Sequence, residues 1–347
     1  MADISTLYAK KLQLGSPFIV ASSGLTQRVD KIKEFAVAGA GAVVLKSIFE
    51  EQLEQEIDYM STGSDFPGAM EYLEQYVKSH AIEEHIQLLK DCREQVNIPV
   101  IASINCYKSK TWLDYAQQLI EAGAAGLELN VMRIDTKPSQ MWGEAENELV
   151  ELVTALRKQM PDVALTLKLG RHYTNIVRLA RDLSMAGADG VVLFNRTYMP
   201  DIDIEAEAIV NGPIFSEAAD YSESLRYAAL VRGGVQGLGI GLSSGARDGK
   251  DLIKGLLAGA DAVHYCTALY KDGADVIRKA NQELADWMNR KQYHNVDEIK
   301  GRLAATRVDH ANMYERSQFM KYYASADARP TGGLDTSSQN NPSQRPF

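Results

Sequence analysis

Two lysines stand at the ends of apolar runs, where a buried charge needs a partner. Lys46 follows the run 43–45, and Lys168 follows the run 165–167. A lysine is almost never fully buried without a counter-charge or a ligand, so each ammonium group could hold an anion, a ligand carbonyl or a Schiff-base substrate. The alternative is that each side chain reaches back to solvent from its strand end. Two such lysines on different strands favour ligand binding.

Two asparagines, Asn130 and Asn195, end two other apolar runs. Asparagine is a poor strand former, but its amide both donates and accepts hydrogen bonds, which suits recognition of an amide-rich ring. The alternative is a cap on the following turn. Glu128 lies two residues before Asn130 and therefore faces the same side of the strand. A carboxylate on an inner face needs a partner, and Lys168 on the neighbouring strand is the candidate.

Two segments rich in Gly, Ser and Thr, 239–249 and 265–268, follow the last two apolar runs. Such residues at the start of a helix present backbone N–H groups to an anion. In barrels, the loops after the seventh and eighth strands are the usual place for a phosphate group. The same residues also form ordinary tight turns, so composition alone leaves both interpretations open.

The histidines and cysteines give no metal or disulfide pattern. His172 is expected at the surface, and His264, inside an apolar run, is expected to be a hydrogen-bonded core residue. Because no histidine pair has metal-ligand spacing, no metal is expected. Cys92, Cys106 and Cys266 share no CxxC spacing, which excludes a four-cysteine iron–sulfur cluster and favours a reducing, cytoplasmic compartment.

A repeated tripeptide indicates the elements that position these side chains. Ala-Gly-Ala occurs at 38–40, 122–124, 186–188 and 258–260, each time after an amphipathic stretch and before an apolar run. Glycine supplies a left-handed helix C-cap, and the alanines allow close approach of the next strand. Repeated helix, turn and apolar strand predict a parallel sheet covered by helices.

Eight strand and eight helix candidates alternate along the chain, which predicts a (β/α)8 TIM barrel, with a doubly wound open sheet as the alternative. The strands are expected at 17–22, 42–46, 99–103, 126–131, 164–168, 190–195, 237–241 and 262–266. The helices are expected at 30–39, 81–95, 111–122, 144–159, 174–186, 223–232, 249–258 and 272–291.

The connections 47–80, 132–143 and 196–221 are long and would lie at the carboxyl ends of the strands, where barrel enzymes keep their chemistry. We expect one domain over residues 1–325, ending in a helical extension at 297–323. Residues 326–347 are rich in Ser, Asn, Gln, Pro and Gly and are expected to be an irregular or disordered tail.

Charge and hydropathy limit the partners. The chain of 347 residues has a net charge of −9 without a cluster of Lys or Arg, so neither nucleic acid nor a membrane surface is an expected partner. No apolar run approaches the length of a membrane span, and residues 1–14 contain no signal-peptide core. A cytoplasmic protein acting on a small molecule is expected.

In order and spacing, these segments resemble the dihydroorotate dehydrogenase family, FMN-dependent (β/α)8 enzymes of pyrimidine synthesis. The resemblance covers roughly residues 10–305 and is closest to the soluble class. It implies a flavin site, with Lys168 favouring the reduced, anionic flavin. The matching residues are Ala21, Ser22 and Ser23 (flavin segment), Lys46, Ser47 and Lys168 (flavin ring), Asn130 and Asn195 (flavin and substrate), and Ser244, Gly245, Cys266 and Thr267 (phosphate).

The substrate half of the family pattern is altered. The family's catalytic loop reads Asn-x-Ser-Cys/Ser-Pro-Asn, whereas here Arg133 stands where the catalytic Cys or Ser belongs. Arginine is always charged and cannot accept a proton. The loop 62–68 also lacks both asparagines of the family's substrate segment. The resemblance therefore implies a flavoprotein whose substrate is dihydroorotate or another small carboxylated ring.

In this interpretation the catalytic residues are Lys46, Arg133 and Asp135, with Arg133 clamping a substrate carboxylate. The base stays open, and the candidates are Asp135, Cys106, Ser22, Tyr107 and His172. One alternative is a Schiff-base or sugar-phosphate barrel enzyme without flavin, using a lysine nucleophile. Another is a non-catalytic FMN-binding paralogue. The resemblance also implies a homodimer or a larger homo-oligomer.

Overall fold

The computed structural model describes residues 2–61, 69–105, 109–307 and 312–316. Eight parallel strands form a sheet that closes on itself, because β4 pairs with both β3 and β6. The predicted (β/α)8 barrel is confirmed. Around the barrel the strands are β3 (Phe18–Val20), β4 (Ala42–Val44), β6 (Val100–Asn105), β7 (Gly126–Asn130), β8 (Ala164–Leu169), β9 (Gly190–Leu193), β12 (Gly239–Leu242) and β13 (Ala262–Tyr265).

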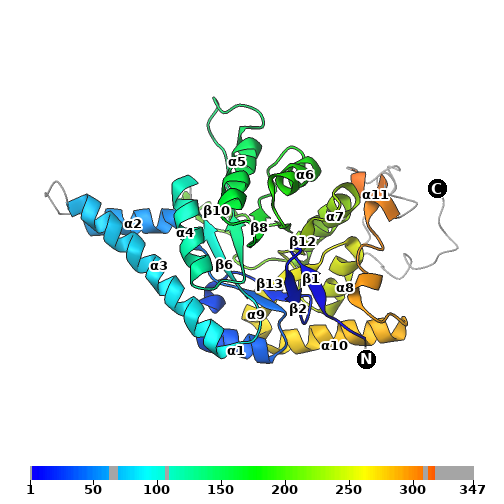
Figure 1. The fold of residues 1–347 in the computed structure, drawn as a ribbon. Coiled ribbons are helices and arrows are strands. Elements are labelled where there is room, and N and C mark those ends of the chain that lie inside the picture. Colours follow the sequence, from blue (N-terminus) through cyan, green and yellow to red (C-terminus); the bar gives the residue numbers. More distant parts are fainter. Residues whose placement is uncertain (1, 62–68, 106–108, 308–311, 317–347) are drawn as a thin grey trace.

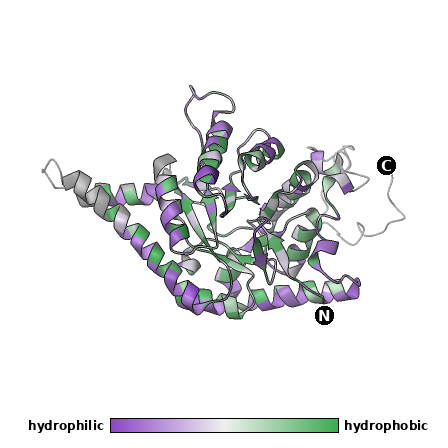
Figure 2. Cartoon of the chain, viewed as in Figure 1, coloured by the Kyte–Doolittle hydropathy of each residue, from purple (hydrophilic) through white to green (hydrophobic). Residues whose placement is uncertain are grey.

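Helices surround the barrel (Figure 1), and hydrophilic and hydrophobic residues interleave along them, as one buried face requires (Figure 2). The strand–helix order is the predicted one. The covering helices are α1 (Val29–Val37), α3 (Ala69–Gln95), α4 (Ser109–Glu121), α5 (Glu144–Gln159), α6 (Ile176–Ala186), α7 (Ala218–Gly234), α8 (Gly249–Ala258) and α10 (Asp275–Arg290).

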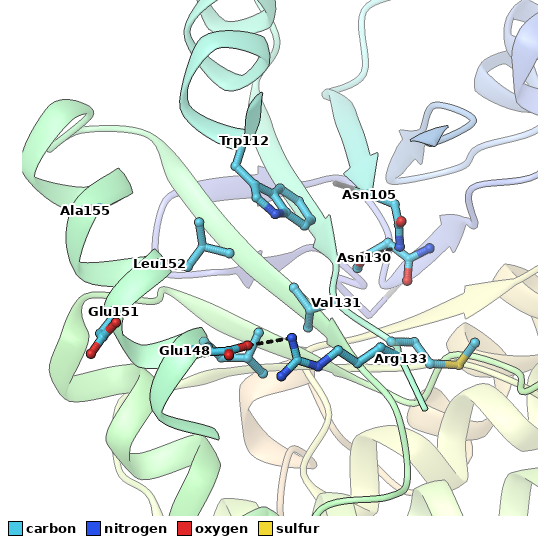
Figure 3. Close-up of a pocket in the computed structure, with 11 residues that line it drawn as sticks. Asn105, Trp112, Asn130, Val131, Arg133, Glu148, Glu151, Leu152 and Ala155 are labelled. Carbon is cyan, nitrogen blue, oxygen red and sulfur yellow. Dashed lines mark hydrogen bonds and ion pairs between the residues drawn. The ribbon is translucent and has the colours of Figure 1, made fainter. Parts of the chain in front are cut away.

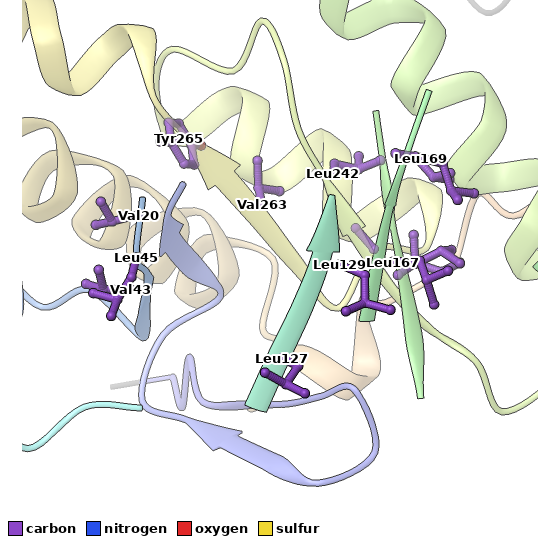
Figure 4. Close-up of a cluster of buried hydrophobic side chains, with 14 of the residues drawn as sticks. Val20, Val43, Leu45, Leu127, Leu129, Leu167, Leu169, Leu242, Val263 and Tyr265 are labelled. Atoms are coloured by element: carbon purple, nitrogen blue, oxygen red, sulfur yellow. The ribbon is translucent and has the colours of Figure 1, made fainter. Parts of the chain in front are cut away.

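The main hydrophobic core lies between the strands and the helices (Figure 4). Alternate strand residues such as Leu127, Leu129, Leu167 and Leu169 belong to it. The residues between them must point into the barrel, because successive side chains on a strand face opposite sides. Glu128, Asn130 and Lys168 therefore face the interior, and the structure leaves each of them less than 10% exposed.

A short hairpin that the sequence analysis did not predict closes one end of the barrel. Strands β1 (Thr6–Tyr8) and β2 (Leu12–Leu14) pair antiparallel. Their side chains form a second core with inward residues from the amino ends of the barrel strands. Gly239 leaves room for this hairpin, because a Cβ there would lie 2.9 Å from the backbone of Ala9. Among the described residues, this hairpin therefore covers the amino ends of the strands and leaves their carboxyl ends uncovered.

The Ala-Gly-Ala turns have the predicted left-handed glycines, with φ of 96° at Gly39, 101° at Gly123, 111° at Gly187 and 121° at Gly259. Two of these turns also contain a hydrogen-bonded arginine–aspartate pair. The Arg157 guanidinium donates to the carbonyl of Gly187 and to the carboxylate of Asp189. That carboxylate accepts a hydrogen bond from the backbone N–H of the preceding strand at Leu165.

The same arrangement recurs one repeat later. Arg232 donates to the carbonyl of Gly259 and to Asp261, whose carboxylate accepts the backbone N–H of Ile240. A lysine completes each cluster: Lys11 lies 3.1 Å from Asp189, and Lys300 lies 3.1 Å from Asp261. The chain thus uses one arginine–aspartate clamp twice to join a helix end, a turn and two strands.

The three long connections take different forms. After β4 come the short strand β5 (Ile48–Phe49), α2 (Glu50–Ser61) and the long α3, which begins well before the predicted helix and extends with α2 away from the barrel (Figure 1). The connection after β7 contains no helix or strand before α5. The connection after β9 forms an exposed antiparallel hairpin, β10 (Pro200–Asp203) and β11 (Ala208–Asn211).

Beyond β13 the chain forms α9 (Thr267–Asp272) and then α10. In the region of the predicted helical extension, the described part of the chain holds only short turns of helix. These are the 3-10 segments Val296–Glu298 and Ala305–Arg307, and α11 (Asn312–Glu315). The predicted tail, 326–347, lies outside the described residues.

Candidate active site

The strand ends bring three serines together at the open end of the barrel, from β3, the segment after β4, and β6. Ser22 Oγ lies 3.2 Å from Ser47 Oγ and accepts the Ser47 backbone N–H at 3.0 Å. Ser47 Oγ lies 2.7 Å from Ser103 Oγ. Ser22 and Ser47 were predicted, whereas Ser103 was not. Its position on the inner face of β6 is the signal that could have identified it.

The two predicted asparagines contact each other. Asn195 donates its side-chain amide to Asn130 Oδ1 at 2.7 Å, and its own Oδ1 accepts the backbone N–H of Arg196 at 2.9 Å. A third amide, Asn105 at the end of β6, donates to the Asn130 carbonyl at 2.7 Å. Asn105 was not predicted, although it also ends an apolar strand.

The two lysines have different surroundings. Lys168 is 7% exposed, and its Nζ lies 4.0 Å from Oε1 of the buried Glu128, the partner expected from the sequence. Lys46 is half-buried, and its Nζ lies 4.4 Å from the centre of the Phe49 ring. Burial lowers the pKa of Lys46. Lys168 lies near the end of β8 and Lys46 lies two residues after β4, so both extend from the carboxyl ends of barrel strands.

The two segments predicted to hold phosphate follow the adjacent strands β12 and β13. Ser244 and Gly245 have left-handed backbones, with φ of 73° and 87°. A Cβ at Gly245 would lie 2.6 Å from the Tyr221 backbone nitrogen, so the turn packs tightly against α7. Thr267 Oγ1 lies 2.8 Å from the hydroxyl of Ser216, which the sequence analysis did not single out.

Cys266 and the flavin segment border the same region. Cys266 is partly buried, and burial raises the pKa of its thiol, an effect that the nearby Lys168 opposes. Ala21 is buried, while Ser22 and Ser23 are partly exposed. The thiol therefore stays uncharged at neutral pH, and it is more a hydrogen-bonding group than a nucleophile.

Arg133 does not point toward the asparagines but toward α5 (Figure 3). Its guanidinium lies 2.6 Å from Glu148 and 3.1 Å from Asp135. Both predicted catalytic residues of this loop are therefore bound to each other. Glu148, which the sequence analysis missed, could not be paired with Arg133 from spacing alone.

A cavity of about 450 Å³ opens beside these residues, between α4 and α5 (Figure 3). Its wall combines apolar side chains with the amides of the barrel mouth and the Arg133–Glu148 pair. The lining residues are Asn105, Trp112, Asn130, Val131, Met132, Arg133, Glu148, Leu149, Glu151, Leu152 and Ala155.

The remaining candidate bases separate into two groups. His172 is exposed, as expected, and Ser22 hydrogen-bonds to Ser47. Cys106 and Tyr107, together with the loop 62–68, lie outside the described residues.

His264 is a buried core residue, as predicted, and lies 3.3 Å from the Tyr8 hydroxyl. Across the described ranges, no three His, Cys, Asp or Glu side chains are grouped to hold a metal ion.

A closed (β/α)8 barrel with amide, hydroxyl and ammonium groups at its strand ends is the architecture of a barrel enzyme with chemistry at the carboxyl face. The family model for dihydroorotate dehydrogenase matches residues 6–288, most of the chain. The chain therefore belongs to the dihydroorotate dehydrogenase family, and the resemblance seen in the sequence is confirmed. This family consists of flavin-dependent oxidoreductases that act on a CH–CH group.

Relatives cover nearly the same length. A protein of Thermoplasma volcanium is 28% identical over 314 residues, covering 87% of this chain and 98% of the relative. Relatives from Thermoplasma acidophilum (26% over 314 residues, 87% and 99%) and Methanocella arvoryzae (28% over 309 residues, 85% and 96%) are similar. All three are named catalytic subunits of dihydroorotate dehydrogenase B (NAD+). Among the described residues, no helix has the length and hydrophobicity to cross a membrane.

Proposed function

We propose that this protein is an FMN-dependent oxidoreductase that oxidises dihydroorotate or a related small carboxylated ring. The observation that carries the proposal is the convergence of Lys168, Asn130 and Asn195 at the open end of the barrel. Amides and an ammonium group are the donors that a flavin's pyrimidine ring needs. The family, and the three relatives described above, which are named dihydroorotate dehydrogenases, support the substrate class.

The residues present fit a flavin. Lys168 has one carboxylate at 4.0 Å and no closer ion pair within the described residues, so its remaining donors are available to a ligand. Lys168, with Asn130, would hold the pyrimidine edge. Ala21, Ser22, Ser23, Lys46 and Ser47 would line the same ring from the neighbouring strands.

The phosphate of FMN would lie at Ser244, Gly245, Cys266 and Thr267. Successive backbone N–H groups in a turn with positive φ form an anion-binding concavity, and Ser244 and Gly245 supply such a turn. The Thr267 hydroxyl, already fixed by Ser216, would add a side-chain donor. This cradle uses no lysine or arginine, which leaves the charged groups for the ring.

Bound FMN would supply the acceptor for a hydride from the substrate. The chain must provide the rest: a group that binds the substrate carboxylate and a group that accepts the second proton. Arg133 is the candidate for the carboxylate, with Asn130 and Asn195 for the ring amides. For Arg133 to act this way, it must exchange Glu148 and Asp135 for the substrate, which would leave Asp135 free to accept a proton.

The test is an absorbance spectrum of the purified protein, followed by anaerobic addition of dihydroorotate. The proposal predicts flavin absorbance, released as FMN on denaturation, and bleaching on addition of substrate. A colourless protein that does not bind added FMN would contradict the cofactor. If other cyclic carboxylates bleach the flavin and dihydroorotate does not, the protein is an enzyme of this class with a different substrate.

A second candidate function is Schiff-base chemistry without flavin, and the lowered pKa of Lys46 favours it. A half-buried amine of reduced pKa is a better nucleophile at neutral pH. Borohydride trapping with sugar phosphates or other carbonyl compounds separates the two functions. A covalent adduct at Lys46 in a colourless protein would replace the flavin proposal.

A third candidate is a non-catalytic flavin-binding paralogue, favoured by Arg133 in place of the family's base and by its two ion pairs. Such a protein would bind FMN, and no dihydropyrimidine would bleach it. The same anaerobic titration distinguishes it from the enzyme.

We also propose that residues 1–325 form one domain and that the protein works in the cytoplasm as a homodimer or larger homo-oligomer. The near-complete coverage of the relatives supports a single unit. The net charge of −9 without a basic cluster argues against nucleic acid and anionic membranes as partners.

A further inference from the structure

A column of four ionisable side chains runs through the barrel interior. It begins at Lys168 and continues through Glu128 and His264 to Tyr8. Glu128 Oε1 lies 4.0 Å from Lys168 Nζ, and Glu128 Oε2 lies 3.7 Å from His264 Nδ1. On the other side of that ring, His264 Nε2 lies 3.3 Å from the Tyr8 hydroxyl. The four residues come from β8, β7, β13 and the N-terminal hairpin, so the fold itself assembles the column.

The column is almost completely shielded from water. Glu128 and His264 are each 1% exposed, and Tyr8 is fully buried. Within the described residues, neither Glu128 oxygen nor His264 Nδ1 makes a hydrogen bond. A buried carboxylate without such bonds is costly. Its retention beside Lys168 therefore points to a role other than stability.

The barrel leaves room for this column at one glycine. A Cβ on Gly241 of β12 would lie 2.7 Å from His264 Nε2 and 3.0 Å from the Tyr8 hydroxyl. Any larger residue there would displace the imidazole. The site is therefore built around the histidine–tyrosine contact, and it is not a by-product of loose packing.

The charge states follow from burial. Burial, together with the nearby Lys168 charge, keeps the pKa of His264 well below its usual value, so the imidazole is neutral. Burial raises the pKa of Glu128, and Lys168 opposes that rise. The Glu128 carboxyl group therefore lies between the neutral imidazole, 3.7 Å away and outside hydrogen-bond distance, and the Lys168 ammonium group at 4.0 Å.

We propose that Glu128 is a positioning residue, the counter-ion that holds the Lys168 ammonium in place for the flavin, with the side chains of His264 and Tyr8 packed below the carboxylate. The proposal rests on the proposed function for the flavin, but the ion pair itself is a property of this chain. Lys168 also acts on Cys266 and His264, and burial disfavours the charged form of each, since it raises the pKa of the thiol and lowers that of the imidazole. Glu128 is thus the counter-charge of Lys168 among the described residues.

Glu128 should then fix the number of protons that the protein takes up when the flavin is reduced. A flavin seated over Lys168 would exclude water, and a desolvated lysine without a carboxylate loses its proton more readily. If Glu128 is the counter-ion at this position, its loss should change the number of protons that the protein takes up when the flavin is reduced, because the reduced flavin is negatively charged.

The first experiment measures the potential of bound FMN against pH, by dithionite titration with indicator dyes, from about pH 6 to about pH 10. For the wild type we expect one proton per two electrons, a slope of about 30 mV per pH unit. For Glu128→Gln we expect part of the plot of potential against pH to show two protons taken up per two electrons, a slope of about 60 mV per pH unit. Thr6→Val, which removes a buried neutral hydroxyl that donates to the Asp261 backbone carbonyl, should keep the wild-type slope. Equal slopes in wild type and Glu128→Gln would overturn the proposal.

The second experiment needs no cofactor and compares the thermal midpoints of the apoproteins Glu128→Gln, Lys168→Met and the double variant. If the two charges are partners, each single variant leaves one of them buried alone, and the double variant unfolds at a higher temperature than the less stable single variant. Additive losses would contradict the pair even in a flavoprotein. Coupling in a protein that binds no flavin would instead contradict the proposed function and leave the ion pair standing.

Discussion

Lys168 and Arg133, two of the three cations that the sequence analysis singles out, differ in what they already contact. Lys168 has one carboxylate at 4.0 Å, while Arg133 has one at 2.6 Å and another at 3.1 Å. Close ion pairs must be broken before a guanidinium can bind a new anion. Lys168 is therefore ready for a ligand, and Arg133 needs a rearrangement of its loop.

Replacing Arg133 tests whether the missing catalytic base is the only feature that limits oxidation of dihydroorotate. Arg133→Cys restores the residue type of the family's base, and general-base catalysis is worth about 10²- to 10⁴-fold. We expect faster anaerobic bleaching by dihydroorotate than in the wild type. Arg133→Ala is the control, because it breaks the same ion pairs without adding a base. No gain over that control would mean that the substrate pocket itself has changed.

The pH dependence of stability should report on His264. Its pKa in the folded protein lies well below the ordinary value of 6.5, so below that pH the unfolded chain binds the extra proton and the folded chain does not. The free energy of unfolding should then fall by up to about 1.4 kcal/mol for each pH unit below about 6.5.

Urea denaturation between about pH 7 and about pH 5 measures this loss. His264→Gln should be less stable at neutral pH but should lose less on acidification. His172→Gln, at an exposed position, is the matched control and should keep the wild-type slope. A His264→Gln slope as steep as that of the wild type would show that other groups cause the acid loss.

Among the elements, two of the repeated turns contain charge clusters that should contribute to stability. The arginine–aspartate clamps lie at the amino ends of the strands, opposite the candidate site. Arg232 and Lys300 both contact Asp261, whose side chain is 7% exposed. A buried charge that loses a partner is left uncompensated, so these clamps should matter to folding and not to chemistry.

Arg232→Ala should lower the free energy of unfolding by about 3 kcal/mol. Arg28→Ala, which breaks an exposed ion pair with Asp30, should cost less than about 1 kcal/mol. Chemical denaturation measures both, and the flavin content of the folded fraction should be unchanged. An equal effect of the two variants would show that the clamp is no stronger than a surface pair.

The barrel strands could be predicted because apolar residues recur along each of them, and an Ala-Gly-Ala turn precedes four of them. The hairpin β1–β2 could not, since its strands have three residues each and their burial depends on the barrel that they close. The hairpin β10–β11 is exposed on both strands and shows no buried face to detect. Its strands arise from pairing within one loop rather than from a hydrophobic pattern.

For the molecule as a whole, the sequence predicts the site only as far as strand ends determine it. The alternation of side chains along β7, together with the neighbouring position of β8, correctly predicted that Glu128 contacts Lys168. The direction of Arg133 depends on Glu148, a residue of the next helix, and no local pattern encodes that contact. Ser216 reaches Thr267 across a long connection, which spacing cannot reveal either.

The hairpin β10–β11 also bears on the proposed oligomer. Ile202, Ile204 and Ile209 are each at least 68% exposed, and grouped exposed apolar side chains are typical of association surfaces. We expect a solution mass that is a multiple of 38.3 kDa. Sedimentation equilibrium of Ile202→Asp should then show a smaller species, while Val37→Asp, at an exposed position on α1, should not. A monomeric wild type would contradict the oligomer.

The N-terminal hairpin covers the amino ends of the barrel strands. Tyr8 and its neighbours pack below His264, and Glu128 and Lys168 lie on its other side. Because the imidazole is only 1% exposed, solvent should reach it when the barrel itself opens. Hydrogen exchange at that ring should therefore measure how often the barrel unfolds.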